Sequence, residues 1–224
     1  MKSRLLVLVA LTSVALAVAG CSARAATTPT APAHTDPFDS APCPTAVSPN
    51  PGNVVATPGI GIDTSKSYSA IVTTGKGTFT IQLYPDAAPT TVNNFVHLAR
   101  CDYYNGVTFH RVIPGFVAQT GDPTGTGAGG PGYVIKDEIN QHKQDKPGVV
   151  AMANAGPGTD GSQFYITLAK FSQAQEALLD KSYTVFGQVT QGMNVVLSLT
   201  PRDPSKNANA PPGDVIKSIK IVEK

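Results

Sequence analysis

The stretch FHRVIPGFVAQTGD, residues 109–122, carries the strongest fold signal in the chain. Apolar and β-branched residues stand on both sides of Pro114-Gly115, which predicts a β-hairpin. Proline presets the first central position of the turn, and glycine tolerates the positive φ of the second. Strand alternation puts Arg111 on the same face as Phe109 and Ile113. The predicted hairpin therefore has a charged residue among apolar neighbours.

The charge of Arg111 can be explained in two ways. Arginine cannot shed its charge, and burying that charge unpaired is costly. Either the strand carries Arg111 out to a solvent-exposed rim, or Arg111 is a functional residue on the wall of an apolar groove. Gln119 is the candidate polar partner in the second interpretation.

The register of the hairpin decides whether Gln119 can reach Arg111. A strict two-residue turn would leave Gln119 opposite His110 instead. To bring Gln119 to the Arg111 face, one extra residue must be absorbed near Phe116 or Val117. Such β-bulges are common beside active sites, so we expect one here.

Three stretches together resemble one protein family. FHRVIPGFVAQTGD is similar to the signature of the cyclophilin-type peptidyl-prolyl isomerases. MANAGPGTDGSQFYI, residues 152–166, resembles the second signature of this family, and YTVFGQV, residues 183–189, resembles the third. The resemblance covers roughly residues 67–222 and leaves out the N-terminal part.

The N-terminus has the pattern of a secretory signal. Lys2 and Arg4 precede an apolar run over residues 5–19, which predicts a signal peptide over residues 1–20. Val18-Ala19-Gly20-Cys21 resembles a bacterial lipobox, in which Cys21 is diacylated; the alternative is an ordinary signal with a chance cysteine. We expect an exported protein that is anchored by lipid on Cys21 to the outer face of a bacterial cell membrane.

The composition of residues 21–66, which is rich in proline, alanine and threonine, predicts a lipid-attached linker. The stretch has no period of 2 or 3.6 and cannot bury enough apolar surface to offset its ordering entropy. We expect residues 22–53 to be poorly ordered, and residues 53–62 to pack on the domain that follows.

The charge balance gives no reason to expect nucleic acid as a partner. The chain has 17 Lys+Arg and 15 Asp+Glu, and removal of residues 1–20 takes away Lys2 and Arg4, which leaves 17 − 2 = 15 basic residues against 15 acidic ones. A formally neutral chain offers no basic field for a polyanion.

Two cysteines remain after Cys21. Cys43 and Cys101 could pair in an oxidising compartment, or stay free. Because Cys43 falls in the segment expected to be poorly ordered, we expect no bond between them.

The pattern of strands and helices expected for residues 67–224 predicts a mainly β domain. Many short strands and only two substantial helices favour a closed β-barrel. The resemblance implies eight antiparallel strands with an α-helix capping each open end. Outside the central hairpin, we expect strands at residues 68–73, 78–83, 148–153, 163–167, 184–189 and 215–222. We expect helices at residues 88–99 and 193–199, and a short one within residues 171–179.

Several other chemistries can be set aside. Gly125, Gly127 and Gly130 satisfy GxGxxG, but Pro131-Gly132 follows where a nucleotide site needs a helix. A surface loop that borders the groove is the better interpretation, and it resembles the glycine-rich loop of the family. Neither GxSxG nor HExxH occurs, and the four histidines lack ligand spacing. We therefore expect no cofactor and no metal site.

The resemblance implies a role for each site residue. It makes Arg111 the donor to the prolyl nitrogen and Gln119 the residue that orients it, while Asn154 offers backbone hydrogen bonds to the substrate. Taken without the resemblance, the apolar positions read as ordinary barrel core. The remaining expected substrate contacts are Phe116, Val117, Ala153, Ala155, Gln163, Phe164, Tyr165, Leu178, Leu179 and Tyr183, with Phe164 behind the proline pocket.

Four of these positions depart from the best-known pattern of the family. Val117 replaces a methionine, Tyr165 a phenylalanine, Leu178 a tryptophan and Tyr183 a histidine. The first two bear on the size of the proline pocket. Loss of the indole at Leu178 predicts weakened binding of cyclosporin-type ligands, because the N–H donor and its broad face are gone.

The leading hypothesis is a monomeric prolyl isomerase that acts on X-Pro bonds of exported or envelope proteins and assists their folding. The alternative is a non-catalytic module that binds Pro-containing segments at the membrane surface. A solute-binding lipoprotein fits the strand pattern less well. Arg111 with Gln119 favours the enzyme.

Overall fold

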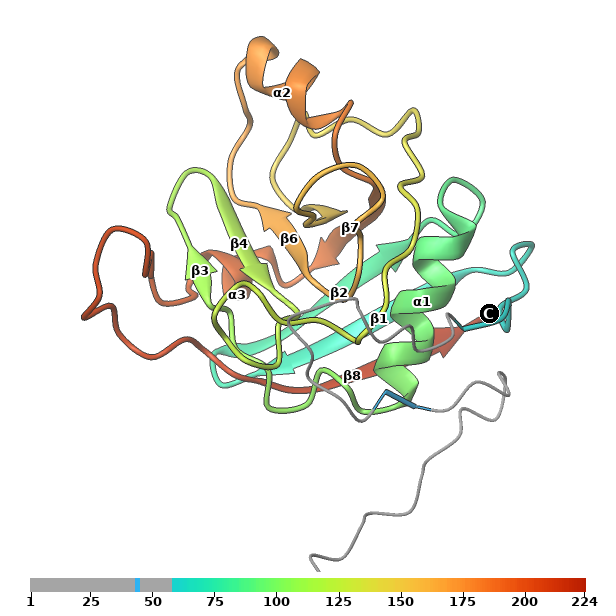
Figure 1. Cartoon of the computed structure of the whole chain (residues 1–224), viewed down its shortest axis with the longest axis horizontal. Helices are drawn as coiled ribbons and strands as arrows, with labels where there is room; N and C mark the ends of the chain where they lie inside the picture. Colours follow the sequence, from blue (N-terminus) through green and yellow to red (C-terminus); the bar gives the residue numbers. More distant parts are fainter. Residues whose placement is uncertain (1–42, 45–57) are drawn as a thin grey trace, which may run out of the picture. The chain divides into compact units, whose positions relative to one another are not determined.

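A computed structural model of the chain describes residues 43–44 and 58–224 (Figure 1). The predicted signal peptide over residues 1–20 and the predicted lipidation site Cys21 lie outside the described residues. So does the stretch expected to be poorly ordered, residues 22–53, apart from Cys43 and Pro44.

The described residues form one eight-stranded sheet in which every ladder is antiparallel. The order of the strands is β3-β4-β6-β5-β7-β2-β1-β8, which confirms the predicted mainly β fold. The strands are β1 (Tyr68–Thr74), β2 (Gly77–Leu83), β3 (Arg111–Val112), β4 (Val117–Thr120), β5 (Val149–Met152), β6 (Phe164–Thr167), β7 (Val185–Gln191) and β8 (Ile216–Glu223).

The sheet curls, but in the described part of the chain no complete hydrogen-bonded ladder joins its two edge strands. The predicted closed barrel is therefore overstated. Among the described residues, the two edge strands β3 and β8 share no ladder. Instead, the loop before β8 pairs with the outer edge of β3. Val112 N donates to Arg202 O at 2.7 Å, and Arg202 N donates to Val112 O at 2.8 Å. This loop takes the hydrogen-bonding edge that β8 would need to complete the barrel.

Alternation along the strands fills the core. Buried and half-buried residues alternate along β1, and alternate residues at the end of β2 are also buried, as expected for strands with one face inward. Aromatic rings from a helix and two strands meet inside the curl. The ring centre of Phe95 lies 5.5 Å from that of Phe164 and 5.3 Å from that of Phe186.

Helix α1 (Pro89–Arg100) packs against β8 and has its amide donors capped from a distance. Ala88 at the N-cap offers no side-chain acceptor. The Glu138 carboxylate takes that role, accepting from Thr90 N at 3.0 Å and Thr91 N at 2.7 Å. A carboxylate at a helix N-terminus is also favoured by the helix dipole.

The other two helices are short. Helix α2 (Gln173–Leu179) begins with a capping box between Ser172 and Gln175, and none of its residues is buried. Figure 1 shows it projecting at the top of the molecule. Helix α3 (Met193–Leu197) is five residues long, so the predicted helix over residues 193–199 is shorter than expected. Within residues 43–44 and 58–224, no helix has the length and apolar character needed to cross a membrane.

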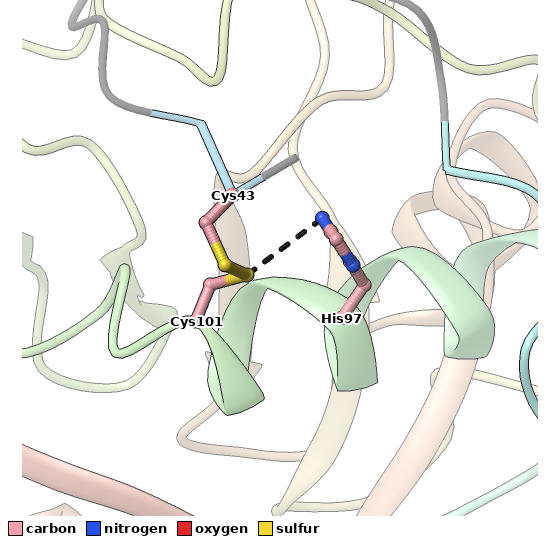
Figure 2. The surroundings of a disulfide bond; sticks show 3 residues. All are labelled: Cys43, His97 and Cys101. Carbon is pink, nitrogen blue, oxygen red and sulfur yellow. Dashed lines mark hydrogen bonds between the residues drawn. A yellow bond between two sulfur atoms is a disulfide. The ribbon is translucent and has the colours of Figure 1, made fainter. Parts of the chain in front are cut away.

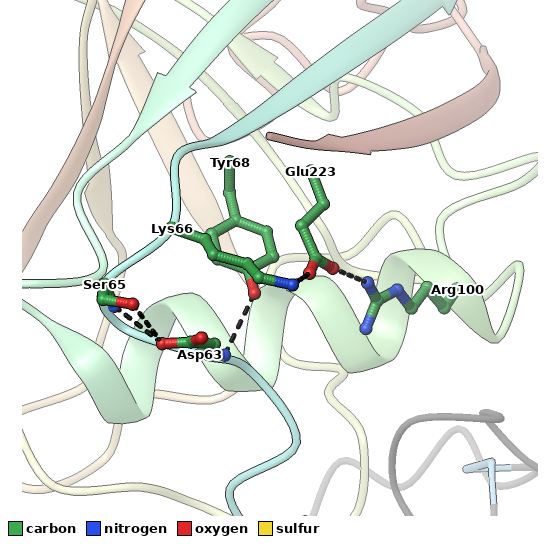
Figure 3. A network of polar contacts seen from close by, with 6 residues as sticks. All are labelled: Asp63, Ser65, Lys66, Tyr68, Arg100 and Glu223. Atoms are coloured by element: carbon green, nitrogen blue, oxygen red, sulfur yellow. Dashed lines mark hydrogen bonds and ion pairs between the residues drawn. The ribbon is translucent and has the colours of Figure 1, made fainter.

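Polar contacts fix the chain on its way into β1 (Figure 3). Glu223 near the end of β8 accepts from Lys66 Nζ at 2.6 Å and from an Arg100 guanidinium nitrogen at 3.2 Å. Just before, Gly61 N and Ile62 N donate to Asn93 Oδ1 on α1. The packing expected for residues 53–62 is therefore observed for the described residues 61–62.

A disulfide joins Cys43 to Cys101, so the expectation of no bond is wrong (Figure 2). Cys101 is the C-cap of α1, which holds it in a fixed position. The two Cα atoms lie 5.5 Å apart, a separation that suits a disulfide. That expectation was based only on the amino-acid composition of the segment around Cys43. The cost of closing a loop grows slowly with its length, so a Pro-rich stretch can still bring a cysteine to a fixed partner.

The disulfide closes a span of 58 residues. We expect Cys43→Ser to lower the free energy of unfolding by at most about 4 kcal/mol, because the unfolded chain regains the loop-closure entropy. Urea denaturation of the oxidised proteins measures this difference. Wild type treated with a reductant should match Cys43→Ser. Equal denaturation midpoints for oxidised wild type and Cys43→Ser would contradict the prediction.

Candidate active site

The central hairpin brings Arg111 and Gln119 directly opposite each other. Phe116 N donates to Ile113 O at 2.9 Å, which closes the turn, and Gly115 takes a φ of 73°. Phe116 then stands as one extra residue before β4 begins. The expected bulge near Phe116 is therefore confirmed, and with it the pairing of the two polar residues across the strands.

Arg111 is half-buried and lies over an aromatic ring. Its guanidinium carbon is 5.8 Å from the centre of the Phe116 ring, within the range of a cation–π contact. Within the described ranges, no carboxylate forms an ion pair with Arg111. This position fits the groove-wall interpretation better than a solvent-exposed rim.

A second apolar cluster lies on the sheet face opposite the main core. Alternation separates the two, because Tyr165 belongs to this cluster while its neighbours Phe164 and Ile166 belong to the core. The Tyr165 hydroxyl donates to Gln144 Oε1 at 2.6 Å, which fixes the ring. The buried members are Val117, Val149, Ala151, Tyr165, Phe171 and Val185, and the half-buried ones are Tyr84, Phe116, Ala153, Leu179 and Tyr183.

A cavity of about 460 Å³ adjoins this cluster. A polar relay crosses it: Gln119 Nε2 donates to Gln163 Oε1 at 3.0 Å, and Gln163 Nε2 donates to Gly127 O and Gly129 O, both at 2.9 Å. The partner of Arg111 is thus tied to the glycine-rich loop. The cavity is lined by residues 127–134, Thr159, residues 161–163 and the predicted site residues Gln119, Ala153, Asn154 and Ala155.

The glycine-rich loop borders the cavity, as predicted, and a buried carboxylate organises it. Asp122 accepts from Thr124 N at 2.7 Å, Thr126 N at 3.0 Å and Gly127 N at 2.6 Å. Burial alone would raise the pKa of Asp122, but the hydrogen bonds outweigh burial and lower it below the ordinary value. The Asp122 carboxylate therefore stays charged and holds the cavity wall in place.

Asn154 is held by its side chain. Its Nδ2 donates to Asp160 Oδ1 at 3.1 Å and to Ser182 O at 3.0 Å. This leaves the adjacent backbone of Ala153 and Ala155 along one wall of the cavity.

Two expected substrate contacts need separate comment. Phe164 is 0% exposed within the main core, so it supports the site from behind and cannot touch a ligand in the groove. Its neighbour Tyr165 points to the opposite face of the sheet, where the second apolar cluster lies. Because neighbouring side chains of a strand point to opposite faces, Phe164 and Tyr165 cannot both lie on that face. Leu178 lies on α2 and is 67% exposed, at the margin of the site.

Sequence reasoning missed several residues of this site, among them Phe171 and Gln144. Phe171 is buried in the apolar cluster, with its ring centre 5.4 Å from that of Phe116. Gln144 reaches Tyr165 from a loop with no sequence period. An aromatic residue just before the α2 capping box was a usable signal for Phe171, whereas nothing local to Gln144 marks it.

Comparison with known proteins agrees with this geometry. A family model described as "Cyclophilin type peptidyl-prolyl cis-trans isomerase/CLD" matches residues 69–221. The chain therefore belongs to the cyclophilin-type peptidyl-prolyl cis-trans isomerases, a family of enzymes. This confirms the resemblance at the level of the family.

Named relatives support the same assignment. The chain is 50% identical over 127 residues to "Peptidyl-prolyl cis-trans isomerase-like 1" of Aspergillus niger, a match that covers 55% of this chain and 75% of the relative. It is 46% identical over 130 residues to "Peptidyl-prolyl cis-trans isomerase CYP18-2" of Arabidopsis thaliana, covering 56% and 76%.

Solved structures share the fold. A cyclophilin-type peptidyl-prolyl cis-trans isomerase from Cryptosporidium parvum superposes with a TM-score of 0.62 at 33% identity. The match covers 70% of this chain and 99% of that one. A second structure of that protein, determined in the presence of the dipeptide Ala-Pro, gives a TM-score of 0.61.

The predicted localisation is wrong in the light of these relatives. The proteins that share about half of their aligned residues with this chain come from fungi, mouse and a plant. Their names describe isomerases or isomerase-like proteins rather than bacterial lipoproteins. A small-residue stretch before Cys21 is a short pattern, and it is outweighed by a match over more than half of the chain.

Asp122 gives a prediction for the cavity wall. Asp122→Asn replaces one acceptor by a donor that faces backbone N–H groups, so we expect it to destabilise the fold by about 2–4 kcal/mol at pH 7. Because the folded-state pKa is lowered, this carboxylate stabilises the fold above the unfolded pKa, and the contribution is lost as pH falls through the folded-state pKa. The difference from wild type should narrow on acidification.

Thermal unfolding from pH 7 down to pH 3 measures this difference. Asp145→Asn is the matched control, because it makes the same chemical change at an exposed position. A loss for Asp145→Asn as large as that for Asp122→Asn, or a gap that does not narrow in acid, would contradict the role given to the loop contacts.

Proposed function

We propose that the chain, acting as a monomer, accelerates rotation about X-Pro bonds of polypeptide segments that bind along the groove beside the β3–β4 hairpin. One observation carries this proposal. Arg111 stands opposite Gln119, with its guanidinium over Phe116 at the edge of the apolar cluster. The apolar pocket would bind the proline ring, and the cation beside it, which has no ion-pair partner among the residues that the structure describes, would be free to contact the prolyl nitrogen.

The chemistry asks for no metal or nucleophile. The barrier is amide resonance, ~18–20 kcal/mol for a peptide bond, and X-Pro bonds interconvert in tens to hundreds of seconds. A turnover of about a thousand per second needs roughly a 10⁵-fold acceleration, or about 7 kcal/mol. That amount can come from binding and electrostatic contacts alone.

Arg111 would supply the electrostatic part. When the X-Pro bond twists, the prolyl nitrogen loses its conjugation and gains an available lone pair. A donor at that nitrogen is therefore stronger in the transition state than in the ground state, which is the condition for catalysis. Gln119, held by Gln163, would keep the guanidinium aligned from the neighbouring strand.

The surrounding residues would hold the substrate. Phe116, Val117, Tyr165 and Leu179 would take the proline ring against the apolar cluster. Asn154 would bind the substrate backbone, and Ala153, Ala155 and Gln163 would form the neighbouring subsite. The structure of the Cryptosporidium relative in the presence of Ala-Pro supports a Pro-containing ligand.

The disulfide supports a class of client. Disulfides persist in oxidising compartments and are rare where thiols are kept reduced. With Cys43 bonded to Cys101, we propose that the enzyme assists the folding of polypeptides that traverse such a compartment on their way to export.

The test of catalysis is Arg111→Ala in an assay that follows cis-to-trans conversion of a Pro-containing peptide. We expect kcat/KM to fall about 100- to 1,000-fold, as for the loss of one transition-state donor. Arg111→Lys should recover only part, because an ammonium lacks the planar fork of donors. Lys181→Ala, which removes an exposed cation near the site, is the control and should leave kcat/KM unchanged. Undiminished turnover by Arg111→Ala, or binding without turnover by wild type, would favour the alternative of a non-catalytic Pro-binding module.

A second test concerns cyclosporin. Leu178 lacks the donor and the broad face of an indole. The lost hydrogen bond is worth about 0.5–1.5 kcal/mol and the lost contact about 1 kcal/mol, so we expect roughly thirty-fold weaker inhibition than for a member with tryptophan there.

Leu178→Trp should restore part of this inhibition. Leu197→Trp on α3 is the matched control, because Leu197 is also exposed, at 57%. Inhibition constants from titration measure the effect. Equal constants for wild type and Leu178→Trp would show that this position does not contribute.

A further inference from the structure

Helix α2 carries part of the proposed proline pocket, yet none of its seven residues is buried. Figure 1 shows it projecting beyond β6 and β7. On its N-terminal side, Phe171 is buried in the second apolar cluster. On its C-terminal side, Leu179 is half-buried against the same cluster, and Asp180 follows as the C-cap. Whatever holds Asp180 therefore also holds Leu179.

The Asp180 carboxylate is nearly buried and reaches a loop 36 residues earlier in the chain. Its side chain is 9% exposed. Oδ1 accepts from Gln144 N at 2.9 Å, and Oδ2 lies 3.3 Å from Lys143 Nζ. The Lys143 side chain is 59% exposed, so water screens this ion pair and it contributes little. The shielded hydrogen bond from the Gln144 backbone is therefore the contact that fixes the C-terminal end of α2.

Gln144 connects this contact to the pocket itself. It is 0% exposed, and its Oε1 accepts from the Tyr165 hydroxyl at 2.6 Å. Among the described residues, Gln144 Nε2 has no hydrogen-bond partner, so the bond from Tyr165 is the one that orients the amide. Asp180 and Gln144 thus form a bracket that joins Leu179 on α2 to Tyr165 on β6 through two hydrogen bonds. A phenylalanine at position 165 would leave the Gln144 end of this bracket unattached.

We propose that the Asp180–Gln144 bracket sets the width of the proline pocket and so determines which cyclic imino acid the enzyme accepts. This inference rests on the proposed function, because it deepens the role given to Tyr165 and Leu179. The two bracket residues touch neither the ring nor the reacting amide. They are positioning residues, which act through Leu179 on one side of the pocket and Tyr165 on the other. The bracket favours the five-membered ring of proline over the six-membered ring of its homologue pipecolic acid.

A fixed width matters because the two rings differ by one methylene. In a hydrophobic pocket, one methylene changes kcat/KM about 10- to 200-fold. Leu179 and Tyr165 lie on separate elements, so the pocket can widen for the larger ring once the link between them is cut. Tyr183 also contacts the Tyr165 ring, with 5.7 Å between the ring centres, so this loosening is partial. We expect the preference for proline to fall about threefold to tenfold, which is the range that one lost hydrogen bond gives.

The test measures kcat/KM for two peptides that differ only in carrying proline or pipecolic acid after the same alanine. We expect Asp180→Ala and Gln144→Leu each to lower the ratio of the two values about threefold to tenfold. The double variant should lower it no further, because both changes cut the same link. An unfolded fraction of a variant lowers both kcat/KM values equally, so the ratio does not respond to a loss of folded protein.

Three further variants separate the bracket from its surroundings. Asp180→Asn keeps an oxygen that can accept from Gln144 N, so it should retain the ratio of wild type. Lys143→Ala removes only the exposed ion pair and should also retain it. Asp145→Ala, a matched change at an exposed position of the same loop, is the control and should leave the ratio unchanged.

The outcomes separate this inference from the proposed function. If wild type turns over the proline peptide but Asp180→Ala or Gln144→Leu keeps its ratio, the inference is overturned and the function stands. The same follows if wild type accepts both peptides equally, or if Asp180→Asn relaxes the ratio as much as Asp180→Ala. If wild type binds the peptides without turnover, the proposed catalysis fails, and the ratio of dissociation constants from NMR titration decides on the bracket by the same criteria. Absence of binding to either peptide overturns both.

Discussion

The site depends on a single extra residue in the turn of the β3–β4 hairpin. With Phe116 inserted after Pro114-Gly115, Arg111 stands opposite Gln119; with a strict two-residue turn it would not. A shift of one residue sends every side chain of a strand to the other face. The same insertion leaves the Phe116 ring beneath the guanidinium. One backbone constraint therefore fixes the cation, its partner and part of the apolar pocket.

One face of the sheet forms the hydrophobic core, and the other forms the apolar part of the candidate site. Inward residues such as Phe164 and Phe186 join Phe95 of α1 in the core. Outward residues such as Tyr165 build the pocket. Since neighbouring residues of one strand serve both, the core that stabilises β6 also fixes the pocket wall. The site is thereby built on rigid strands, which suits a reaction that is accelerated by fixed contacts rather than by a chemical group.

Polar side chains from the loops hold in place the parts of the molecule that the strands do not position. Asp122 gathers the amides of the glycine-rich loop, Gln163 ties that loop to Gln119, and Asp160 holds Asn154. Glu138 plays a comparable part for α1, whose N-cap residue has no side-chain acceptor. The contacts of Gln163 and Glu138 join segments that lie far apart in the chain, whereas those of Asp122 and Asp160 stay within single loops.

The sequence by itself determined the family, the strand-rich domain and the cationic hairpin, because these depend on local patterns: alternation, turn residues and three ordered motifs. It also predicted the bulge, since only that register pairs Arg111 with Gln119. The tertiary structure alone decided the incomplete closure at β3, the Cys43–Cys101 bond and the places of Phe171 and Gln144. These rest on contacts between distant segments, whose geometry no local pattern specifies.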